Sequence, residues 1–323
     1  MIWRYQLRRV LVAFALLLAF AVAACSSGHP SIAAPSPSPS PTSTASPIGF
    51  PESPAVPTPT VTPPAASTAP MPYPALEVAF IDVGQGDAIL VDQGTTEVLI
   101  DGGPSSGSQA LLSYLRGHVD GPLEAVVATH PHADHIGGLP AVLASFDVED
   151  VWVNGETATT QAYRLFITAA TEEGCPLETG YRGETLQAGD LAFKVLSPEA
   201  LSDTTNENSL VLELDYGNVS FLFTGDAGAD SEASTLAAGL LHQVTVLKVG
   251  HHGSRYSSSA AFLQATRPAV AVYMAGAGNS YGHPHAETLA GLAGIGGIVC
   301  GTDKNGTVVV DSDGNMYSVE TAR

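Results

Sequence analysis

The chain has 323 residues, 45% of them hydrophobic and 33 of them glycine, so it is long enough for one large globular core with many turns. Its 32 acidic residues against 12 basic ones give a formal net charge of −20. Because non-specific binding to long nucleic acid is driven by Lys and Arg on phosphates, this charge argues against that class of function.

The first 24 residues are typical of a secretory signal. Arginines in the first nine residues precede an apolar run, Val10 to Ala24, that is shorter than the roughly 20 residues of a membrane span. The sequence VAAC, which ends at Cys25, resembles a bacterial lipobox and predicts a lipid on Cys25 as the mature N-terminus. We therefore expect a signal peptide over 1–24 and a membrane-anchored, extracytoplasmic lipoprotein; the alternatives are a plain cleaved signal, giving a secreted protein, or an uncleaved anchor.

Residues 25–74 are expected to form a disordered linker. Fifteen prolines fall between Pro30 and Pro74 among Ser, Thr and Ala, a composition that cannot bury a core and favours an extended chain. One folded domain is predicted over 75–323. The sequence leaves open whether a disulfide joins Cys175 and Cys300 within it.

Strand and helix patterns alternate through the predicted domain. Strand pairs open each half, which predicts two sheets packed face to face with helices outside. The predicted strands are 76–83, 88–92, 97–100, 123–128, 148–153, 191–196, 209–214, 219–223, 244–249, 270–274, 298–300, 307–310 and 316–319. The bounded helices are 108–115, 139–145, 160–173 and 230–241.

The densest cluster of metal-ligand side chains is THPHADHIGG, residues 129–138. His130 and His132 are two apart, so in an extended segment they fall on the same side and can share one ion. Asp134 and His135 lie where the chain turns toward a helix and can face a second ion. Imidazole and carboxylate suit zinc, with manganese or iron as alternatives. The reading without a metal is a polar, His-rich turn.

Four further stretches place ligand-type side chains just after predicted strands. Asp101 precedes two glycines, although a simple Asp-Gly turn has the same pattern. Asp226 is suited to bridging two ions, or else to capping a helix. His251 and His252 stand together between glycines, a setting unusual for core residues. The polar loop NSYGHPH, residues 279–285, carries two more histidines; its alternative is a plain surface loop.

The motifs FIDVGQGDAILV, LIDGG, THPHADHIGGL, NENSLVLEL, FLFTGDA, VLKVGHHGSRYSS and NSYGHPH resemble the metallo-β-lactamase superfamily in order and spacing. Within it they resemble the nuclease-like domain of ComEC-type competence proteins, because GQGD, HHGS and YGHP are more specific than the shared H-x-H-x-D-H. The resemblance runs from about Leu76 to the C-terminus and implies an α+β fold, a four-layer αβ/βα sandwich. Those competence proteins carry many membrane-spanning helices, so we expect a free-standing version here.

The resemblance also implies site residues. Asp101 would brace the ligand loop. The histidine after the later strand would be His251, with His252 the less certain choice. The implied metal ligands are His130, His132, Asp134, His135, Asp226 and His251.

One departure from the superfamily pattern concerns the second ion. No histidine occurs between His135 and His242, and the corresponding place reads NENS, residues 206–209. One zinc ion would have four ligands and the other three, so we expect one or two ions, the second weaker. The implied sets are Asp134, His135, Asp226 and His251 for one ion and His130, His132 and Asp226 for the other.

The resemblance implies that a metal-activated water attacks a phosphorus atom. Asp134 or Asp226 would orient the nucleophile, and His252 or His283 would assist the leaving group. We expect a phosphodiester substrate, with DNA the leading candidate. The supporting and substrate-binding candidates are Asp87, Asp101, Asn208, Ser209, Lys248, Ser254, Arg255 and Asn279.

Two alternative functions remain. The superfamily also hydrolyses lactams, lactones and thioesters, and the acidity of the chain suits such small substrates. A non-catalytic, metal-binding surface lipoprotein linked to DNA uptake is the other alternative, although an intact ligand set argues against it. The sequence does not indicate an oligomeric state.

Overall fold

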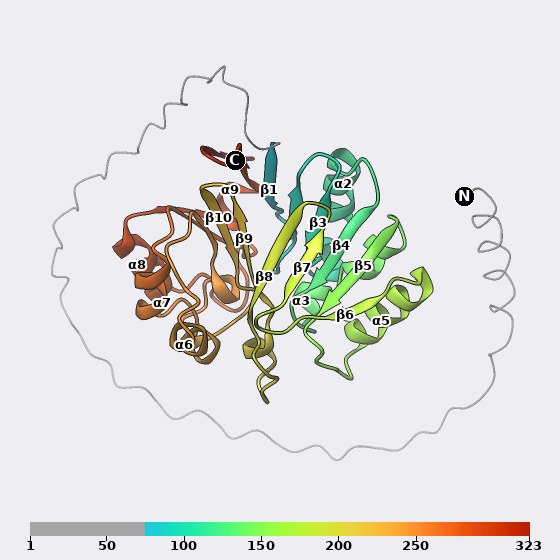
Figure 1. The fold of residues 1–323 in the computed structure, drawn as a ribbon, viewed down its shortest axis with the longest axis horizontal. Helices are drawn as coiled ribbons and strands as arrows, with labels where there is room; N and C mark the ends of the chain where they lie inside the picture. The colour runs from blue at the N-terminus through green and yellow to red at the C-terminus, as the bar shows by residue number, and fades with distance from the viewer. Residues whose placement is uncertain (1–74) are drawn as a thin grey trace, which may run out of the picture. The chain divides into compact units, whose positions relative to one another are not determined.

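The computed structural model describes residues 75–323 (Figure 1). The signal peptide, the lipid on Cys25 and the linker, all predicted within 1–74, lie outside the described residues and stay predictions. No helix in the described part of the chain is both long enough and apolar enough to span a membrane.

The first of two sheets has eight strands. They are β1 (Leu76–Phe80), β2 (Ile89–Asp92), β3 (Glu97–Ile100), β4 (Leu123–Ala128), β5 (Val148–Val153), β6 (Leu177–Thr179), β14 (Val308–Ser312) and β15 (Tyr317–Thr321). Their order is β15-β14-β1-β2-β3-β4-β5-β6. The neighbours from β3 to β6 are parallel and the others antiparallel, so the C-terminal hairpin completes the sheet that the first strands begin.

The second sheet has seven strands in the order β13-β12-β11-β10-β9-β8-β7. They are β7 (Thr185–Ala188), β8 (Leu191–Ser197), β9 (Val211–Tyr216), β10 (Val219–Phe223), β11 (Val246–Lys248), β12 (Val270–Tyr273) and β13 (Ile298–Gly301). The strands from β10 to β13 are parallel and those from β7 to β10 antiparallel.

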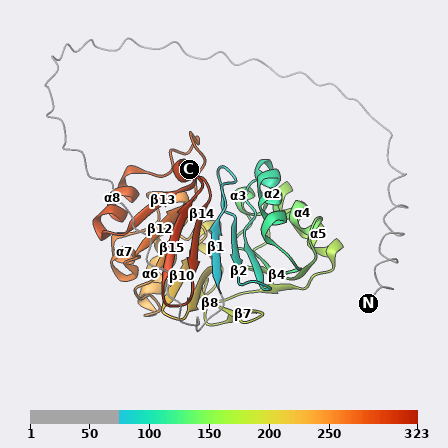
Figure 2. The ribbon, with the colours of Figure 1, turned by 90° about the horizontal axis from the view of Figure 1, so that it is seen from above.

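Helices cover the outer face of each sheet, as Figures 1 and 2 show. On the first sheet lie α2 (Ser108–His118), α3 (Ala133–Ile136), α4 (Leu139–Leu143) and α5 (Gln161–Glu173). On the second lie α6 (Ala229–Ala237), α7 (Ala260–Thr266) and α8 (Ala286–Ile295). The short helices are α9 (Thr302–Asn305), η2 (Ser105–Gly107), η3 (Thr205–Asn208) and η4 (Gly250–Gly253).

Three buried hydrophobic clusters correspond to the three contacts between four layers. Alternate residues of a strand face opposite sides, so β1 directs Val78 and Phe80 to the central cluster and Ala79 to the cluster under α2. Phe221 and Phe223 meet the central cluster from the opposite sheet. A third cluster lies between the second sheet and its helices. The predicted α+β, four-layer αβ/βα sandwich is confirmed.

Several boundaries differ from the sequence prediction. The first strand ends at Phe80 and not at Val83, and α6 ends at Ala237, just before Gly239 with its φ of 68°. The strands β6 and β7 were not predicted, because β6 is an edge strand with all three residues exposed and β7 has no apolar run, since exposed polar residues alternate with Leu186 and Ala188. Cys175 packs against the cluster under α5 whereas Cys300 is in the central cluster, so no disulfide joins them.

Candidate metal centre

One edge of the sandwich collects the ligand-type side chains from both sheets. Asp101 directly follows β3, and the histidine-rich segment begins two residues after β4. Asp226 follows β10, and the histidine pair follows β11. Asp87 comes just before β2, which runs antiparallel to β3, so the start of β2 lies at the same edge. Chain topology therefore brings together residues up to 165 positions apart, from Asp87 to His252.

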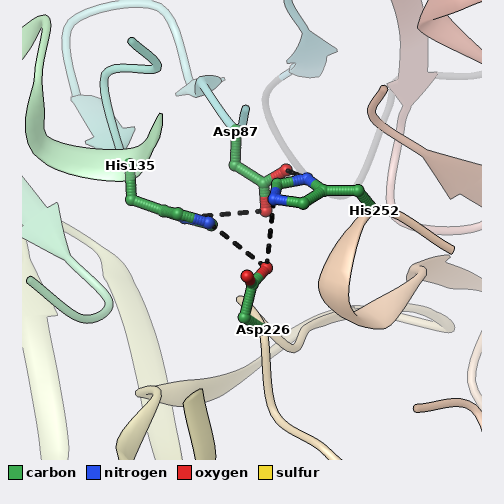
Figure 3. Close-up of side chains that lie close together, drawn as sticks. All are labelled: Asp87, His135, Asp226 and His252. Carbon is green, nitrogen blue, oxygen red and sulfur yellow. Dashed lines mark ion pairs between the residues drawn. The ribbon is translucent and has the colours of Figure 1, made fainter. Parts of the chain in front are cut away.

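In the inner part of this site, two ring nitrogens and one carboxylate oxygen point at one another. Asp226 Oδ1 lies 3.2 Å from His135 Nε2 and 3.5 Å from His252 Nε2 (Figure 3). Asp134 Oδ2 lies 3.2 Å from His252 Nε2. The Nε2 atoms of His135 and His252 and Oδ1 of Asp226 are buried and form no hydrogen bond. A buried polar atom without a partner costs about 1–3 kcal/mol, and a divalent cation with imidazole and carboxylate ligands would satisfy all three. The residues present therefore fit a metal ion.

The opposite nitrogen of each of these rings is held by the protein. His135 Nδ1 lies 2.7 Å from Asp101 Oδ2. His252 Nδ1 lies 2.9 Å from the carbonyl oxygen of Met274 and 3.2 Å from Asp87 Oδ1. In the neutral rings, the hydrogen bonds to Asp101 and to the Met274 carbonyl hold the proton on Nδ1 and leave the lone pair of Nε2 toward the centre. Asp101 and the Met274 carbonyl thus orient ligand-type rings from behind, and Asp87 adds a negative charge beside His252.

A second, more open group of atoms shares Asp226. His130 Nε2 lies 3.0 Å from His132 Nδ1 and 3.8 Å from Asp226 Oδ2. The other nitrogen of His130 contacts Thr129 Oγ1 at 3.1 Å, and that hydroxyl donates to Asp101 at 2.8 Å. Three residues make up this group, and His132 is exposed. The two oxygens of Asp226 therefore face two unequal groups of ligand-type atoms.

Left-handed backbone at three non-glycine residues shapes the centre. Asp101, His251 and His252 have φ values of 60°, 48° and 56°. Such conformations cost on the order of 1 kcal/mol or more each, and they persist where the surrounding structure fixes them. The successive left-handed residues turn His252 into the buried group, whereas the His251 side chain is 25% exposed with Nε2 3.7 Å from Asp226 Oδ2.

The backbone of Gly86 also approaches the centre closely. A Cβ at Gly86 would lie 2.1 Å from the carbonyl oxygen of Asp134, so only glycine fits that turn.

The electrostatics of the inner group favour positive charge on His135 and His252. Burial lowers the pKa of His252, but Asp226 and Asp87 outweigh it and raise that pKa to about 10. Burial likewise opposes charge on His135, yet Asp226 and Asp101 hold its pKa well above its ordinary value. The imidazoles in turn hold the pKa of Asp226 well below its usual range despite burial. A metal ion needs the neutral rings, so its binding would release protons.

The candidate ligands border an open pocket of about 270 Å³. Six predicted site residues line it: His132, Asp134, Asp226, His251, His252 and His283. Four lining residues were missed by the sequence reasoning: Ala133, which lies inside the histidine cluster, and the polar residues Gln85, Asn206 and Tyr281. The signal of the three polar residues was present, because Gln85 is part of GQGD, Asn206 begins NENS and Tyr281 is part of YGHP.

Four predicted substrate contacts have other partners. Lys248 is buried with Nζ 2.5 Å from Asp87 Oδ2, so its charge is used inside the protein. Ser254 is also buried, and its hydroxyl accepts from the backbone N–H of Tyr256. Arg255 pairs with Glu287 at 3.1 Å. The fourth is Asn279, and none of the four residues lines the pocket.

The NENS segment has a structural role around the missing histidine position. Asn208 is buried, and its amide donates to Glu156 and to the carbonyl oxygen of Ser202. The Ser209 hydroxyl accepts from the backbone N–H of Asp226 at 3.1 Å. Asn208 therefore braces the loop and Ser209 positions the shared carboxylate.

Comparison with known proteins agrees with this geometry. Residues 81–276 match the family model described as "Metallo-beta-lactamase superfamily". The chain is 35% identical over 259 residues to ComE operon protein 3 of Bacillus subtilis (strain 168), which covers 73% of this chain and 33% of that protein. It is 32% identical over 258 residues to Recombination protein 2 of Haemophilus influenzae, and this match covers 77% of this chain and 30% of that protein. The chain thus spans about a third of the length of these relatives, and the predicted resemblance to competence proteins is confirmed.

Among solved structures, the fold is similar to that of the metallo-beta-lactamase fold protein YhfI from Bacillus subtilis. The TM-score is 0.51 at 14% identity, with 74% of this chain and 100% of that chain covered. At this identity the likeness is one of fold. The family match, the two-sheet fold and the shared-carboxylate centre together show that the chain belongs to the metallo-beta-lactamase superfamily, whose fold is that of metal-dependent hydrolases.

Proposed function

We propose that this protein is a metal-dependent phosphodiesterase that acts on DNA or a related phosphodiester. The observation that carries the proposal is the shared carboxylate: Asp226 offers one oxygen to each of two groups of ligand-type atoms. Two ions side by side suit a phosphodiester, because they can neutralise charge on both the attacking and the leaving oxygen.

Zinc is the proposed metal, with manganese as the alternative, because the ligand-type atoms are imidazole nitrogens and carboxylate oxygens. When bound, such an ion lowers the pKa of water and polarises a phosphoryl oxygen. We assign the inner ion to His252 and not to His251, since only His252 has its Nε2 in the buried group. The proposed ligands are Asp134, His135, Asp226 and His252 for the inner ion and His130, His132 and Asp226 for the outer one.

The residues around the pocket have separable proposed roles. Asp134 is a lining residue with a side chain 31% exposed, so its second oxygen would accept a proton from the nucleophile. Burial and the nearby His252 and His251 lower the pKa of His283 to about 4. His283 is therefore neutral near pH 7. It would accept a proton or contact the substrate, and it would not act as the acid that protonates the leaving group. As a proposed ligand with both ring nitrogens engaged, His252 would not assist the leaving group.

The support for DNA comes from the relatives. Their names, ComE operon protein 3, Recombination protein 2 and Competence protein ComA, include recombination and competence, which are processes that handle DNA. Action outside the cytoplasm, with a lipid on Cys25 as membrane anchor, is also part of the proposal. It rests on the predicted signal and lipobox.

The test is hydrolysis by the metal-loaded protein. We expect cleavage of bis(p-nitrophenyl) phosphate and of DNA with zinc or manganese, lost in a His132→Ala/Asp134→Ala variant. Asp190→Asn, in an exposed turn, is the control that should keep full activity. Absence of turnover with either metal, or equal turnover by the double variant, would contradict the proposal.

A second candidate, hydrolysis of a small lactam, lactone or thioester, is favoured by one observation. None of the described residues that line the pocket is Lys or Arg, so no side chain there is a permanent cation for a phosphate. Cleavage of a chromogenic lactam without cleavage of either phosphodiester would support this candidate instead.

A further inference from the structure

An exposed aromatic ring stands at the mouth of the metal pocket. Tyr281 is 65% exposed, although it is one of the residues that line the pocket. Its ring is stacked on His283, with centroids 5.7 Å apart and planes inclined by 23°. The His283 ring lies 6.1 Å from that of His252. Three neighbouring rings, an inner tilted pair and an outer stacked pair, thus lead from His252 outward to the exposed ring of Tyr281.

The loop that carries this stack is internally braced. Asn279 Oδ1 accepts from the backbone N–H groups of Tyr281 and His283, both at 3.1 Å. The Asn279 amide donates to the carbonyl oxygens of Gly276 and His283. These bonds hold the backbone on both sides of Tyr281, so less conformational entropy is lost when a ligand stacks on it. Asn279 thereby supports the stack rather than contacting a substrate itself.

The remaining chemistry of the pocket points to recognition without fixed cations. The amide nitrogen of Gln85 is buried without a partner, while Gln85 Oε1 accepts from the backbone N–H of Gly276. No Lys or Arg is among the described residues that line the pocket, and the chain as a whole carries a net charge of −20. A substrate would therefore be held by the metal ion, by a hydrogen bond from a donor such as Gln85 and by stacking. Ion pairs between its phosphates and Lys or Arg side chains would contribute little.

We propose that Tyr281, stacked on His283, is the platform for an unpaired nucleobase next to the cleaved phosphodiester, which makes the substrate single-stranded or a short nucleotide. The inference rests on the proposed function and specifies its substrate. Bases of any sequence offer a flat face to an aromatic ring, whereas a paired base already has neighbours on both faces. Tyr281 is then a specificity-determining residue outside the metal ligands.

The experiment compares four DNAs on the zinc-loaded full chain: a thymidine trinucleotide, the same trinucleotide with an abasic centre, and one longer strand in unpaired and in paired form. The unpaired strand should be cleaved faster than the paired one, and equal cleavage of the two forms would overturn the platform. The wild type should cleave the base-bearing trinucleotide about tenfold more efficiently than the abasic one, within the range that stacking supplies. Tyr281→Ala should bring that ratio near one through a higher KM, and Tyr281→Phe should keep it. The matched control is Tyr256→Ala, since Tyr256 is 73% exposed and is not among the lining residues.

The outcomes separate the platform from the proposed function. An unchanged ratio in Tyr281→Ala with its zinc content intact, or an equal loss on the abasic trinucleotide, would overturn the platform while leaving the phosphodiesterase in place. If no phosphodiester is cleaved, the proposed function fails. Fluorescence anisotropy with the same trinucleotides then decides the platform: tighter binding of the base-bearing one, lost in Tyr281→Ala, supports it, and equal binding refutes it.

Discussion

Asp101 shows how a residue that is outside the pocket can control the metal centre. Its two oxygens contact His135 Nδ1 at 2.7 Å and the backbone N–H and hydroxyl of Thr129 at 2.8 Å each. Thr129 in turn contacts His130, so one carboxylate orients a ring in each group of ligand-type atoms. Burial raises the pKa of Asp101, although His135 opposes this.

We predict that Asp101→Asn weakens metal binding without unfolding the protein. Asparagine tolerates the left-handed backbone at φ 60°, but it supplies no negative charge to His135. Loss of such an orienting partner typically lowers metal affinity by about 10- to 100-fold. Competition with a chromophoric zinc chelator measures the change, and Asp190→Asn is the control. Unchanged affinity in Asp101→Asn would show that the carboxylate is dispensable.

The histidine pair marks the limit of prediction from sequence at this scale. The glycine neighbours make the two histidines unusual for core residues, and only the resemblance favours His251 as the ligand. The choice depends on two successive left-handed residues, which no periodicity reveals. Asp226 could be predicted as a candidate ligand from its place after a strand. That one of its oxygens faces His135 and the other faces His130 could not be predicted, because this depends on how the two sheets pack together.

Among the secondary-structure elements, β3 carries an unusual charge at its start. Glu97 is fully buried, and one of its carboxylate oxygens has no hydrogen-bond partner. Burial raises the pKa of Glu97 from its usual 4.5 to about 7, and the neighbouring Glu124 adds to this. Between these pH values the folded protein binds more protons than the unfolded chain, so stability falls as the pH rises from about 4.5 to about 7.

We therefore expect Glu97→Gln to stabilise the protein at alkaline pH only. The amide cannot ionise, so it avoids a buried charge worth roughly 1–2 kcal/mol, which corresponds to about 3–6 °C in Tm. Thermal denaturation should give this increase at pH 8 and almost none at pH 4.5. Glu149→Gln, an exposed change in β5, should shift Tm at neither pH. A Glu97→Gln gain that is equal at both pH values would contradict the assigned pKa.

Most elements could be predicted because their signals are local. Buried strands such as β4 and β10 read as apolar runs, and their observed bounds match the prediction. The edge strand β6 has no such run, since its stability comes from pairing with β5. The pairing of β14 with β1 joins residues more than 200 positions apart, which a local pattern cannot indicate.

For the whole molecule, the candidate metal centre combines side chains from both sheets. The first sheet supplies His135 and its neighbours, and the second supplies Asp226 and His252, so an ion between them would link both halves. An ion that binds only the folded state stabilises it by about 2.7 kcal/mol at 100 times its Kd. Removing it with a chelator should lower Tm by roughly 5–10 °C, and zinc should restore the loss. Differential scanning calorimetry with and without chelator measures this, and an unchanged Tm would argue against a stabilising ion.

We propose that the buried group around Asp226 Oδ1, with His252 and not His251, holds a metal ion. Elemental analysis of zinc bound per chain tests it most directly, on the wild type, His252→Ala and His251→Ala purified in parallel. We predict at least one tightly bound zinc in the wild type, retention of that zinc in His251→Ala and its loss in His252→Ala. Zinc retained by His252→Ala but lost by His251→Ala, or no bound zinc in the wild type, would contradict this assignment of the ligands.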